Sequence, residues 1–330
     1  MHVKSEPLGR RRFLALGGAA LLLGTAPAQA REAAPVKVLS GAAFATGWRV
    51  ALRDDANISG LQARLANTLH TIDLAFSPWR SDSMIGRFNR SHADEAVVSD
   101  AVVGVARSAL GIAEASGGRF DPTVGPMVAR WGFGPIEKGE TLPDGWRKIR
   151  AGNGHVARTA RGLTLDFCGI AKGYALDRMA ADLLDAGHED FLVDLGGELA
   201  ARGRHPSGRA WHVGIENPLP DAEGLNGVLQ LDGMAVATSG DRRNGYDVGG
   251  RRYSHIIDPS TLEPVAGAPA SVSVLMPAAL DADGWATALM AAGSAGPDLA
   301  RARDIAALFL FRHRDALRSV ATGAFTRYLV

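Results

Sequence analysis

The chain has few of the residues that mark disulfide-bonded, zinc-binding or nucleic-acid-binding proteins. Its 330 residues include one cysteine, Cys168, which excludes an internal disulfide. Cys and His residues at the spacings of a zinc site are also lacking. Basic and acidic residues are nearly balanced, at 36 and 35, so there is no basic bias of the kind that nucleic-acid binders show. We therefore predict no nucleic-acid partner, and we expect Cys168 to be a small buried side chain.

The apolar run at the amino terminus is too short for a membrane anchor, which is the alternative to a cleaved signal. Residues 13–26 fall short of the ~20 residues that a bilayer span needs, and they are rich in Gly and Ala. Three arginines precede the run at 10–12 and Ala-Gln-Ala follows it at 28–30, a pattern typical of a twin-arginine signal peptide. We expect residues 1–30 to be removed, leaving 31–330 as a periplasmic mature domain of net charge about −2.

Two further absences narrow the enzyme class. There is no GxSxG segment, so a serine hydrolase has little support. The residues around Lys172 lack the glycine spacing of a Walker motif and the Ser or Thr that follows its lysine. A P-loop nucleotide hydrolase is therefore not expected.

What the chain does contain is a succession of helices and strands without regular alternation. Apolar residues at three- and four-residue steps predict helices over 58–76, 99–115 and 176–187. Strand-like runs are found at 191–195, 211–216, 234–238, 253–257 and 271–276, several of them joined by short Gly-rich turns. We predict an α+β fold with a largely antiparallel sheet and packed helices, and not a doubly wound nucleotide-binding sheet.

The segment DFCGIAKGYALD, from Asp166, suits a phosphate-binding turn. A short strand ending near 166–168 is expected to meet Gly169, and a helix begins within a few residues. Free N–H groups at a helix start attract anions, glycines at 169 and 173 permit close approach of a ligand, and Lys172 adds a positive charge. The structural alternative is a tight strand-to-helix turn with a solvated lysine.

The segment ADGWAT, from Ala282, suits a hard metal ion. Asp283 and Thr287 are four residues apart in a helix expected to start near Asp281, so their oxygens project from one face. A carboxylate and a hydroxyl suit Mg²⁺, which keeps water or phosphate oxygens in its other positions. The alternative is a helix cap at Asp283 and a threonine that bonds its own backbone.

The segment ATSGDRRNGYDVGGRRYSHIIDP, from Ala237, offers hydroxyls and a possible base. Thr238, Ser239 and Gly240 follow a strand and suit contact with a ligand at a turn. His255 and Asp258 lie three residues apart, and an imidazole near a carboxylate suits a general base toward a hydroxyl. The alternative is structural, because Ser, Gly and Asp-Pro are also ordinary turn residues.

These three segments, together with GGRFDPTVGP from Gly117, resemble in the same order the signature blocks of the ApbE family of flavin transferases. FSPWRSDSMIGRFN at 76–89, LVDLGGELAARG at 192–203 and WHVGIENP at 211–218 extend the resemblance. It implies an α+β enzyme that takes FAD as substrate and uses Mg²⁺. Such an enzyme transfers FMN through a phosphoester to a Thr or Ser of an acceptor protein and releases AMP.

The resemblance also implies roles for particular residues. Asp283 and Thr287 would hold the metal with a backbone carbonyl near the lysine turn, that of Gly169. Lys172 would hold the phosphates and act in catalysis. His255 and Asp258 would activate or orient the acceptor hydroxyl. The flavin nucleotide pocket would be lined by residues of the first and third blocks: Asp121, Thr123, Thr238, Ser239, Gly240 and His255.

Two positions depart from the family pattern. Cys168 stands where the family commonly has glycine, and Leu262 replaces the glycine of DPxTG. The change to Leu262 removes backbone freedom close to His255 and Asp258, so a differently shaped turn is expected there.

Other functions compatible with these residues stay open at this point. A FAD pyrophosphatase, releasing FMN and AMP, would use the same metal and lysine with water in place of the acceptor. A non-catalytic flavin-binding protein would not need Asp283 and Thr287. The acceptor is expected to be a membrane-associated redox protein, and maturation of an exported system such as nitrous-oxide reductase is one such role.

Overall fold

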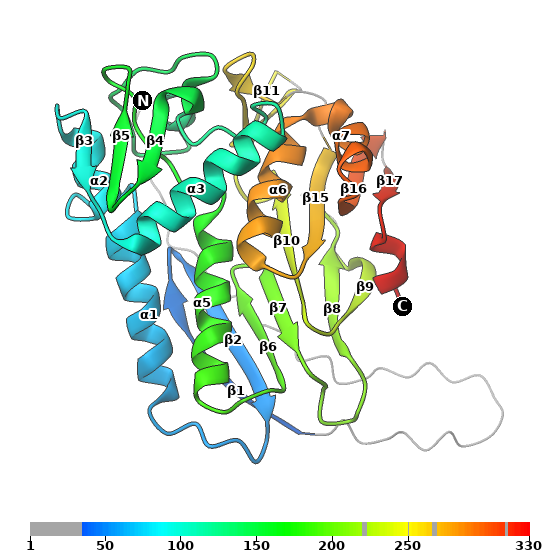
Figure 1. The fold of residues 1–330 in the computed structure, drawn as a ribbon. Coiled ribbons are helices and arrows are strands. Elements are labelled where there is room, and N and C mark those ends of the chain that lie inside the picture. Colours follow the sequence, from blue (N-terminus) through cyan, green and yellow to red (C-terminus); the bar gives the residue numbers. More distant parts are fainter. Residues whose placement is uncertain (1–34, 220–222, 250, 266–268, 314–315) are drawn as a thin grey trace. The chain divides into compact units, whose positions relative to one another are not determined.

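An eight-stranded antiparallel sheet forms the centre of the fold (Figure 1). The computed structural model describes residues 35–219, 223–249, 251–265, 269–313 and 316–330, so the expected signal peptide over 1–30 lies outside the described residues. Neighbouring strands of this sheet pair antiparallel throughout. In spatial order its strands are β1 (Val36–Ala43), β2 (Thr46–Arg53), β6 (Phe191–Leu195), β7 (Glu198–Arg202), β10 (Met234–Gly240), β15 (Pro269–Met276), β16 (Ala306–His313) and β17 (Ala316–Thr322).

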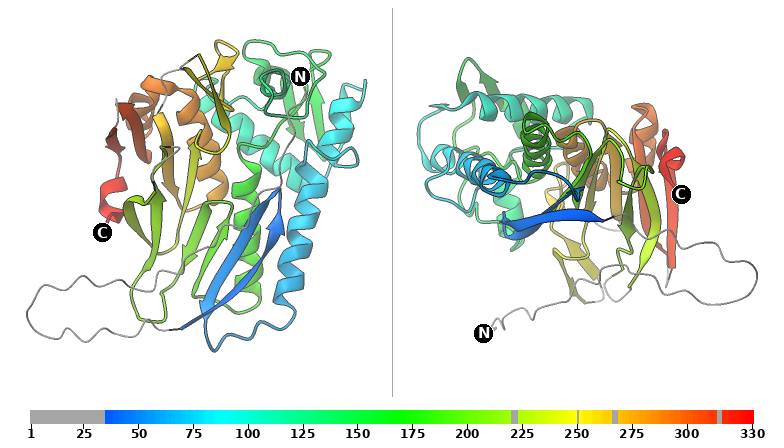
Figure 2. Two further views of the ribbon diagram at one scale, coloured as in Figure 1. Left: turned by 180° about the vertical axis from the view of Figure 1, so that it is seen from behind. Right: turned by 90° about the horizontal axis from the view of Figure 1, so that it is seen from below.

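Both faces of this sheet are covered, which gives three layers (Figure 2). One face packs on helices α1 (Leu61–Phe76), α5 (Ala171–Asp185) and α6 (Ala279–Ala291), and α3 (Asp100–Ala115) packs in turn on α6. The other packs on the hairpin of β8 (Trp211–Glu216) and β9 (Leu225–Leu231) and on η3 (Phe325–Tyr328). In β16, Phe309 packs toward α6 while its neighbours Leu308 and Leu310 pack toward β8 and β9, as the alternation of side chains along a strand requires.

The predicted helices are confirmed, with small shifts of their ends. In α1, five residues at three- and four-residue steps are buried: Leu61, Leu65, Leu69, Ile72 and Phe76. Helix α3 is capped by Ser99, whose hydroxyl accepts from the N–H of Val102, and it stops before Gly117 and Gly118, which both have positive φ. Helix α5 ends before Gly187, again at positive φ.

Smaller elements complete the fold. Strands β3 (Glu95–Val97), β5 (His155–Arg158) and β4 (Ile149–Gly152) form a three-stranded sheet, and two further hairpins pair β11 (Gly245–Val248) with β12 (Arg251–Ser254) and β13 (Ile257–Asp258) with β14 (Glu263–Pro264). Short helical turns are α2 (Met84–Arg90), α4 (Gly125–Arg130), η1 (Gly145–Lys148), η2 (Gly293–Ala295) and α7 (Gly296–Ala302).

Two predicted strands are wrong in ways that matter for the site. The backbone over 164–167 pairs with no strand, because Leu165 bonds the Asn89 side chain and Asp166 bonds the Pro122 carbonyl. The run over 253–257 is broken, because the N–H of His255 bonds the Asn244 carbonyl and that of Ile256 bonds the Ser254 hydroxyl. His255 therefore lies between β12 and β13.

The α+β class and the antiparallel sheet are confirmed. Among the described residues, no helix has both the length and the apolar character needed to cross a membrane.

Candidate active site

A cavity of about 1300 Å³ brings most of the predicted site residues together. Its wall is formed by residues of α5, α6, β7, β8 and β10 and by loops near 77–80, 131–134 and 240–244. The predicted residues that line it are Asp121, Gly169, Lys172, Thr238, Ser239, Gly240, His255, Asp283 and Thr287. Thr123 and Asp258 do not line it.

Three oxygen atoms meet where α5 begins beside α6. The Thr287 hydroxyl donates to the Gly169 carbonyl at 3.2 Å and lies 3.4 Å from the Ser239 hydroxyl. This approach requires glycine at 169, because a Cβ there would lie 2.9 Å from the Thr287 hydroxyl. One turn earlier on α6, the buried Asp283 carboxylate accepts from the N–H of Gly173 at 2.9 Å.

Glycine at 173 makes the second close approach possible. A Cβ at this position would lie 2.2 Å from the carbonyl oxygen of Ala279, so any side chain would push α5 away from α6. The Gly169 carbonyl, the Thr287 hydroxyl and the Asp283 carboxylate thus form an oxygen cluster where α5 meets α6. Such oxygens are the ligands that hard cations prefer. No group of three or more His, Cys, Asp or Glu able to hold a metal occurs among the described residues. A cation here would need oxygens from a ligand as well.

The charges around this cluster are buried together. Lys172, in the first turn of α5, forms an ion pair with Glu198 of β7, whose side chain is almost fully buried. Burial acts to lower the pKa of Lys172, but the Glu198 and Asp283 carboxylates outweigh it, so that pKa is raised and the ammonium stays charged. Burial raises the pKa of Asp283, and Lys172 opposes this rise. The site therefore holds a fixed positive charge beside an oxygen cluster.

The ring of His255 is held in a defined tautomer. Its Nδ1 lies 3.0 Å from the Asn244 carbonyl, and because a carbonyl only accepts, Nδ1 carries the proton. Nε2 of the neutral ring is then left with a free lone pair. The edge of the ring also meets Phe133, at 6.2 Å between centroids. Burial lowers the pKa of His255, which favours the neutral, proton-accepting form.

Asp258 does not accompany His255 as the sequence suggested. Its carboxylate accepts from Arg119 at 3.0 and 3.1 Å and from the N–H and hydroxyl of Ser260. The reason is the break at His255, which places Asp258 in the separate β13–β14 hairpin. In the structure the partner of the imidazole is a backbone carbonyl, and Asp258 anchors a turn.

Asp121 and Thr123 differ in their relation to the cavity. Thr123 has no exposed surface, and its N–H and hydroxyl both donate to the Asp121 carboxylate, at 2.8 and 2.7 Å. Burial raises the pKa of Asp121, against these hydrogen bonds. Asp121 lines the cavity, as predicted, whereas Thr123 supports it from behind.

Strand β10 presents its last residues to the cavity. The Thr238 hydroxyl lies 2.8 Å from that of Ser273 on β15, and Ser239 reaches Thr287 on α6. The strand thus joins the sheet to the oxygen cluster. Cys168 also lines the cavity and is half-buried, less than expected of a small buried side chain, and burial raises the pKa of its thiol well above the usual value.

Several lining residues were not singled out from the sequence. Glu198 follows two glycines in the segment LVDLGGELAARG, and a charged residue beside the apolar run Leu-Ala-Ala was the available signal. Trp79 is 64% exposed on the cavity wall, which is unusual for so large an apolar side chain. Nothing in the local sequence indicates that the backbone of Asn244 would hold His255.

Comparison with known proteins assigns the family. The ApbE family model matches residues 44–309, which is most of the chain. The chain belongs to the ApbE family. Among curated relatives, a FAD:protein FMN transferase of Klebsiella pneumoniae (strain 342) is 32% identical over 342 residues, covering 97% of both chains. One of Vibrio cholerae is 33% identical over 307 residues, covering 88% of this chain and 92% of the relative.

Solved ApbE structures have the same fold. A histidine-to-glycine variant of the flavin transferase ApbE from Vibrio cholerae superposes with a TM-score of 0.80 at 30% identity, covering 90% of this chain and all of the other. The apo form of the Pseudomonas stutzeri flavinyl transferase ApbE gives 0.79 at 33% identity, covering 89% and 96%. The resemblance found in the sequence blocks is therefore confirmed over the whole matched region.

Proposed function

We propose that this protein is a Mg²⁺-dependent FAD:protein FMN transferase that joins FMN to a Thr or Ser hydroxyl of an acceptor protein. The chain is an enzyme of the flavin-transferase family, and its relatives carry that activity in their names. The metal requirement, the phosphoester linkage and the acceptor are the proposed parts.

The observation that carries the proposal is the oxygen cluster of Gly169, Thr287 and Asp283 beside Lys172 in one cavity. A pyrophosphate needs positive charge around it, and Lys172 supplies one fixed charge. The volume of about 1300 Å³ exceeds the roughly 300–1,000 Å³ of ordinary small-molecule pockets and suits a dinucleotide such as FAD.

The reaction forms one P–O bond and breaks another. The acceptor hydroxyl oxygen attacks the phosphorus of the FMN half, and the bond from that phosphorus to the bridging oxygen breaks, so that AMP leaves. The hydroxyl proton passes to Nε2 of His255, whose lone pair is free because Nδ1 is bonded to Asn244. Lys172 neutralises charge on the departing phosphate.

The residues that would hold Mg²⁺ are Asp283, Thr287 and the carbonyl of Gly169. Their oxygens are of the type that this ion prefers, and the remaining positions suit phosphate oxygens of FAD. When bound, the ion supplies charge stabilisation to the phosphate oxygens. Glu198, by holding Lys172, keeps the ammonium beside the same oxygens.

The proposed place of action is the periplasm, reached through the twin-arginine signal at residues 1–30. The proposed acceptor is an exported or membrane-associated redox protein, such as a component of nitrous-oxide reductase maturation. Support for this location comes from the sequence pattern of the amino terminus.

The test mixes the protein, FAD and Mg²⁺ with an acceptor domain that carries a modifiable Thr or Ser. Acceptor mass and AMP release are followed, with EDTA in a parallel sample. A metal-dependent mass gain equal to FMN supports the proposal. Free FMN and AMP with an unmodified acceptor would indicate a pyrophosphatase instead, and the absence of both products would leave only flavin binding.

A further inference from the structure

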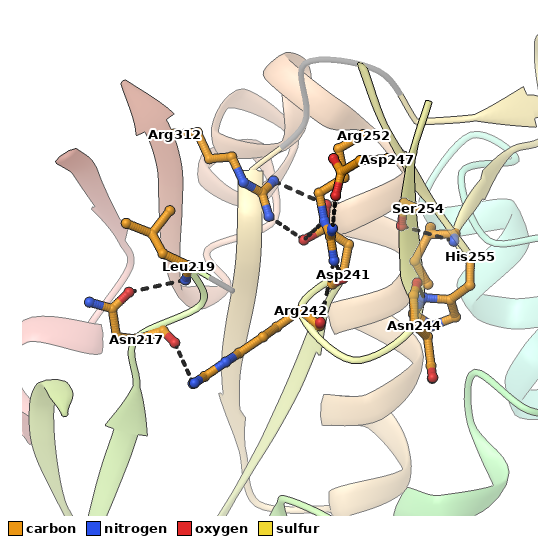
Figure 3. A network of polar contacts seen from close by, with 11 residues as sticks. Asn217, Leu219, Asp241, Arg242, Asn244, Asp247, Arg252, Ser254, His255 and Arg312 are labelled. Atoms are coloured by element: carbon orange, nitrogen blue, oxygen red, sulfur yellow. Dashed lines mark hydrogen bonds and ion pairs between the residues drawn. The ribbon is translucent and has the colours of Figure 1, made fainter. Parts of the chain in front are cut away.

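One loop holds the candidate base His255 in place. The carbonyl of Asn244, at the end of the loop between β10 and β11, accepts both the backbone N–H of His255 at 3.1 Å and its ring Nδ1 at 3.0 Å (Figure 3). The position of this single carbonyl therefore sets both the location of the ring and the nitrogen that carries its proton.

The loop is in turn held by the side chain of Arg252, which lies on β12. Nη2 of this guanidinium donates to the carbonyls of Asp241 and Arg242, and Nη1 donates to the Asp247 carboxylate at 2.7 Å. Its Nε lies 3.6 Å from the Asp241 carboxylate. One side chain thus joins both strands of the β11–β12 hairpin to the first residues of the loop (Figure 3).

The charges of this cluster balance within the fold. The Asp241 carboxylate is 3% exposed and also accepts two hydrogen bonds from Arg312 of β16, one of them at 3.0 Å. Two guanidiniums thus face the carboxylates of Asp241 and Asp247. Because Arg312 alone satisfies Asp241 in a two-pronged pair, loss of the Arg252 charge leaves no buried carboxylate unpaired.

We propose that Arg252 is a positioning residue for the transfer reaction, acting through the loop and the Asn244 carbonyl to keep His255 protonated at Nδ1 and open at Nε2. This inference rests on the proposed function for the role of His255, but the tautomer itself does not depend on it. Only an arginine can donate to two loop carbonyls and to the Asp247 carboxylate at once while its charge also faces the Asp241 carboxylate.

The experiment compares Arg252→Met and Arg252→Lys with Asp247→Asn as the matched control. Asp247→Asn removes the exposed partner of Arg252 and leaves its bonds to the loop carbonyls. Nitrogen-15 spectra of histidine-labelled protein report which ring nitrogen bears the proton, and the His255→Gln variant identifies the His255 signals by their loss. Steady-state transfer rates give kcat and the KM for FAD.

In Arg252→Met we expect the His255 ring to lose its uniform Nδ1–H form and kcat to fall by about ten- to hundredfold. That loss is part of the ~10²–10⁴-fold that a placed base contributes. The KM for FAD should change by a smaller factor than kcat, because the oxygen cluster and Lys172 are untouched and only the loop over 242–244 belongs to the cavity wall. Arg252→Lys should lie between this variant and the wild type, and Asp247→Asn should match the wild type.

A wild-type histidine spectrum in folded Arg252→Met would overturn the proposal, whatever the activity. Equal effects of Arg252→Met and Asp247→Asn would also overturn it, since general support of the hairpin would then explain both. If Arg252→Met does not fold, the spectrum of Arg252→Lys decides in its place. Failure of the wild type to transfer FMN would count against the proposed function alone, because the tautomer is measured without acceptor or FAD.

Discussion

Three charged side chains at the candidate site are more informative together than any one of them. Lys172, Glu198 and Asp283 come from α5, β7 and α6, and all three meet at one cavity. If both carboxylates were charged against one ammonium, a buried place would hold an excess negative charge, and burial accordingly raises the pKa of both, that of Glu198 to about 7. A bound Mg²⁺ would favour the charged form of both carboxylates, which makes the proposed metal ligand Asp283 the first residue to test.

Asp283→Asn should lower FMN transfer by at least about a hundredfold, since charge stabilisation by a metal is worth several kcal/mol. The amide keeps an oxygen to accept from Gly173, so the contact between α5 and α6 survives. Turnover is measured at saturating FAD over a range of Mg²⁺ concentrations. The control is Asp281→Asn, an exposed carboxylate on the same helix, which should behave as the wild type. Near-normal turnover of Asp283→Asn would remove this residue from the metal site.

His255 predicts the acid side of the pH profile. Burial lowers its pKa, so the neutral ring should persist below the ordinary histidine value of about 6.5. The transfer rate should therefore be full above that value and fall only at lower pH, as the ring becomes charged and Nε2 loses its lone pair. Rates are measured from acid to neutral pH at saturating FAD and Mg²⁺.

The His255→Gln variant should be slow and should lack this acid-side fall. His212 also lines the cavity and has a pKa lowered by burial, so His212→Gln is the matched control and should keep the wild-type profile. A fall in rate centred well above 6.5, or one retained in His255→Gln, would assign the titrating group elsewhere.

At the scale of elements, the β13–β14 hairpin contains a residue in an unfavourable conformation. Leu262 has φ of 60°, in the left-handed region, and its N–H closes the turn on the Asp258 carbonyl at 2.8 Å. This is the position where the sequence departs from the family glycine. The turn here is left-handed at a leucine, although glycine adopts this conformation most easily.

Leu262→Gly should raise the free energy of unfolding by about 0.5 kcal/mol. Left-handed backbone costs a non-glycine residue about 1–2 kcal/mol, and the greater freedom of glycine in the unfolded chain offsets part of the gain. Thr261, one residue earlier, does not have a left-handed backbone, so Thr261→Gly should lower the free energy of unfolding instead. The measurement is urea unfolding of both variants. A loss of stability in Leu262→Gly would contradict the inference that the backbone at Leu262 is strained.

Arg158 of β5 holds the three-stranded sheet to α2 through backbone carbonyls. Its buried guanidinium donates to the carbonyls of Ser91 and Ala93, both at 2.7 Å, and to those of Phe88 and Leu163. Arg158→Met would leave these acceptors unpaired, so we expect a loss of roughly 2–4 kcal/mol in unfolding free energy. Arg150→Met on neighbouring β4, where the guanidinium bonds only nearby carbonyls, should cost less than about 1 kcal/mol. Equal losses of unfolding free energy in the two variants would show that the carbonyl contacts of Arg158 contribute no more to stability than those of Arg150.

How far the sequence predicts these elements depends on whether the pattern is local. The apolar spacing of α1 and the cap of α3 are local, and both helices were predicted. The oxygen cluster could be predicted in part, because Asp283 and Thr287 share one helical face. Glu198 and the Asn244 carbonyl could not, since their roles arise from contacts between distant segments. The partners of Asp258, Arg119 and Ser260, could not be predicted either, because Arg119 lies far away in the sequence.

At the scale of the whole molecule, the cavity joins the helix layer to the central sheet. Helices α5 and α6 supply its charges and oxygens, while β7 and β10 supply Glu198 and the hydroxyls. A ligand bound there contacts both layers in the folded state and has no such site in the unfolded chain. Binding of FAD should therefore stabilise the entire described fold. The size of this stabilisation should depend on the metal.

FAD with Mg²⁺ should raise the melting temperature by roughly 5 °C at a FAD concentration about a hundred times its Kd, where linkage supplies about 2.7 kcal/mol. FAD with EDTA should give a clearly smaller rise, because the pyrophosphate then meets only Lys172, and Mg²⁺ alone should give little. Asp283→Asn serves as the matched variant: its rise with FAD should be the same with Mg²⁺ and with EDTA. Thermal unfolding followed by circular dichroism needs no acceptor protein, so the result bears on the site even where the acceptor is unknown. Equal rises with Mg²⁺ and with EDTA in the wild type would show that FAD binding does not use the metal, and the oxygen cluster would then need another explanation.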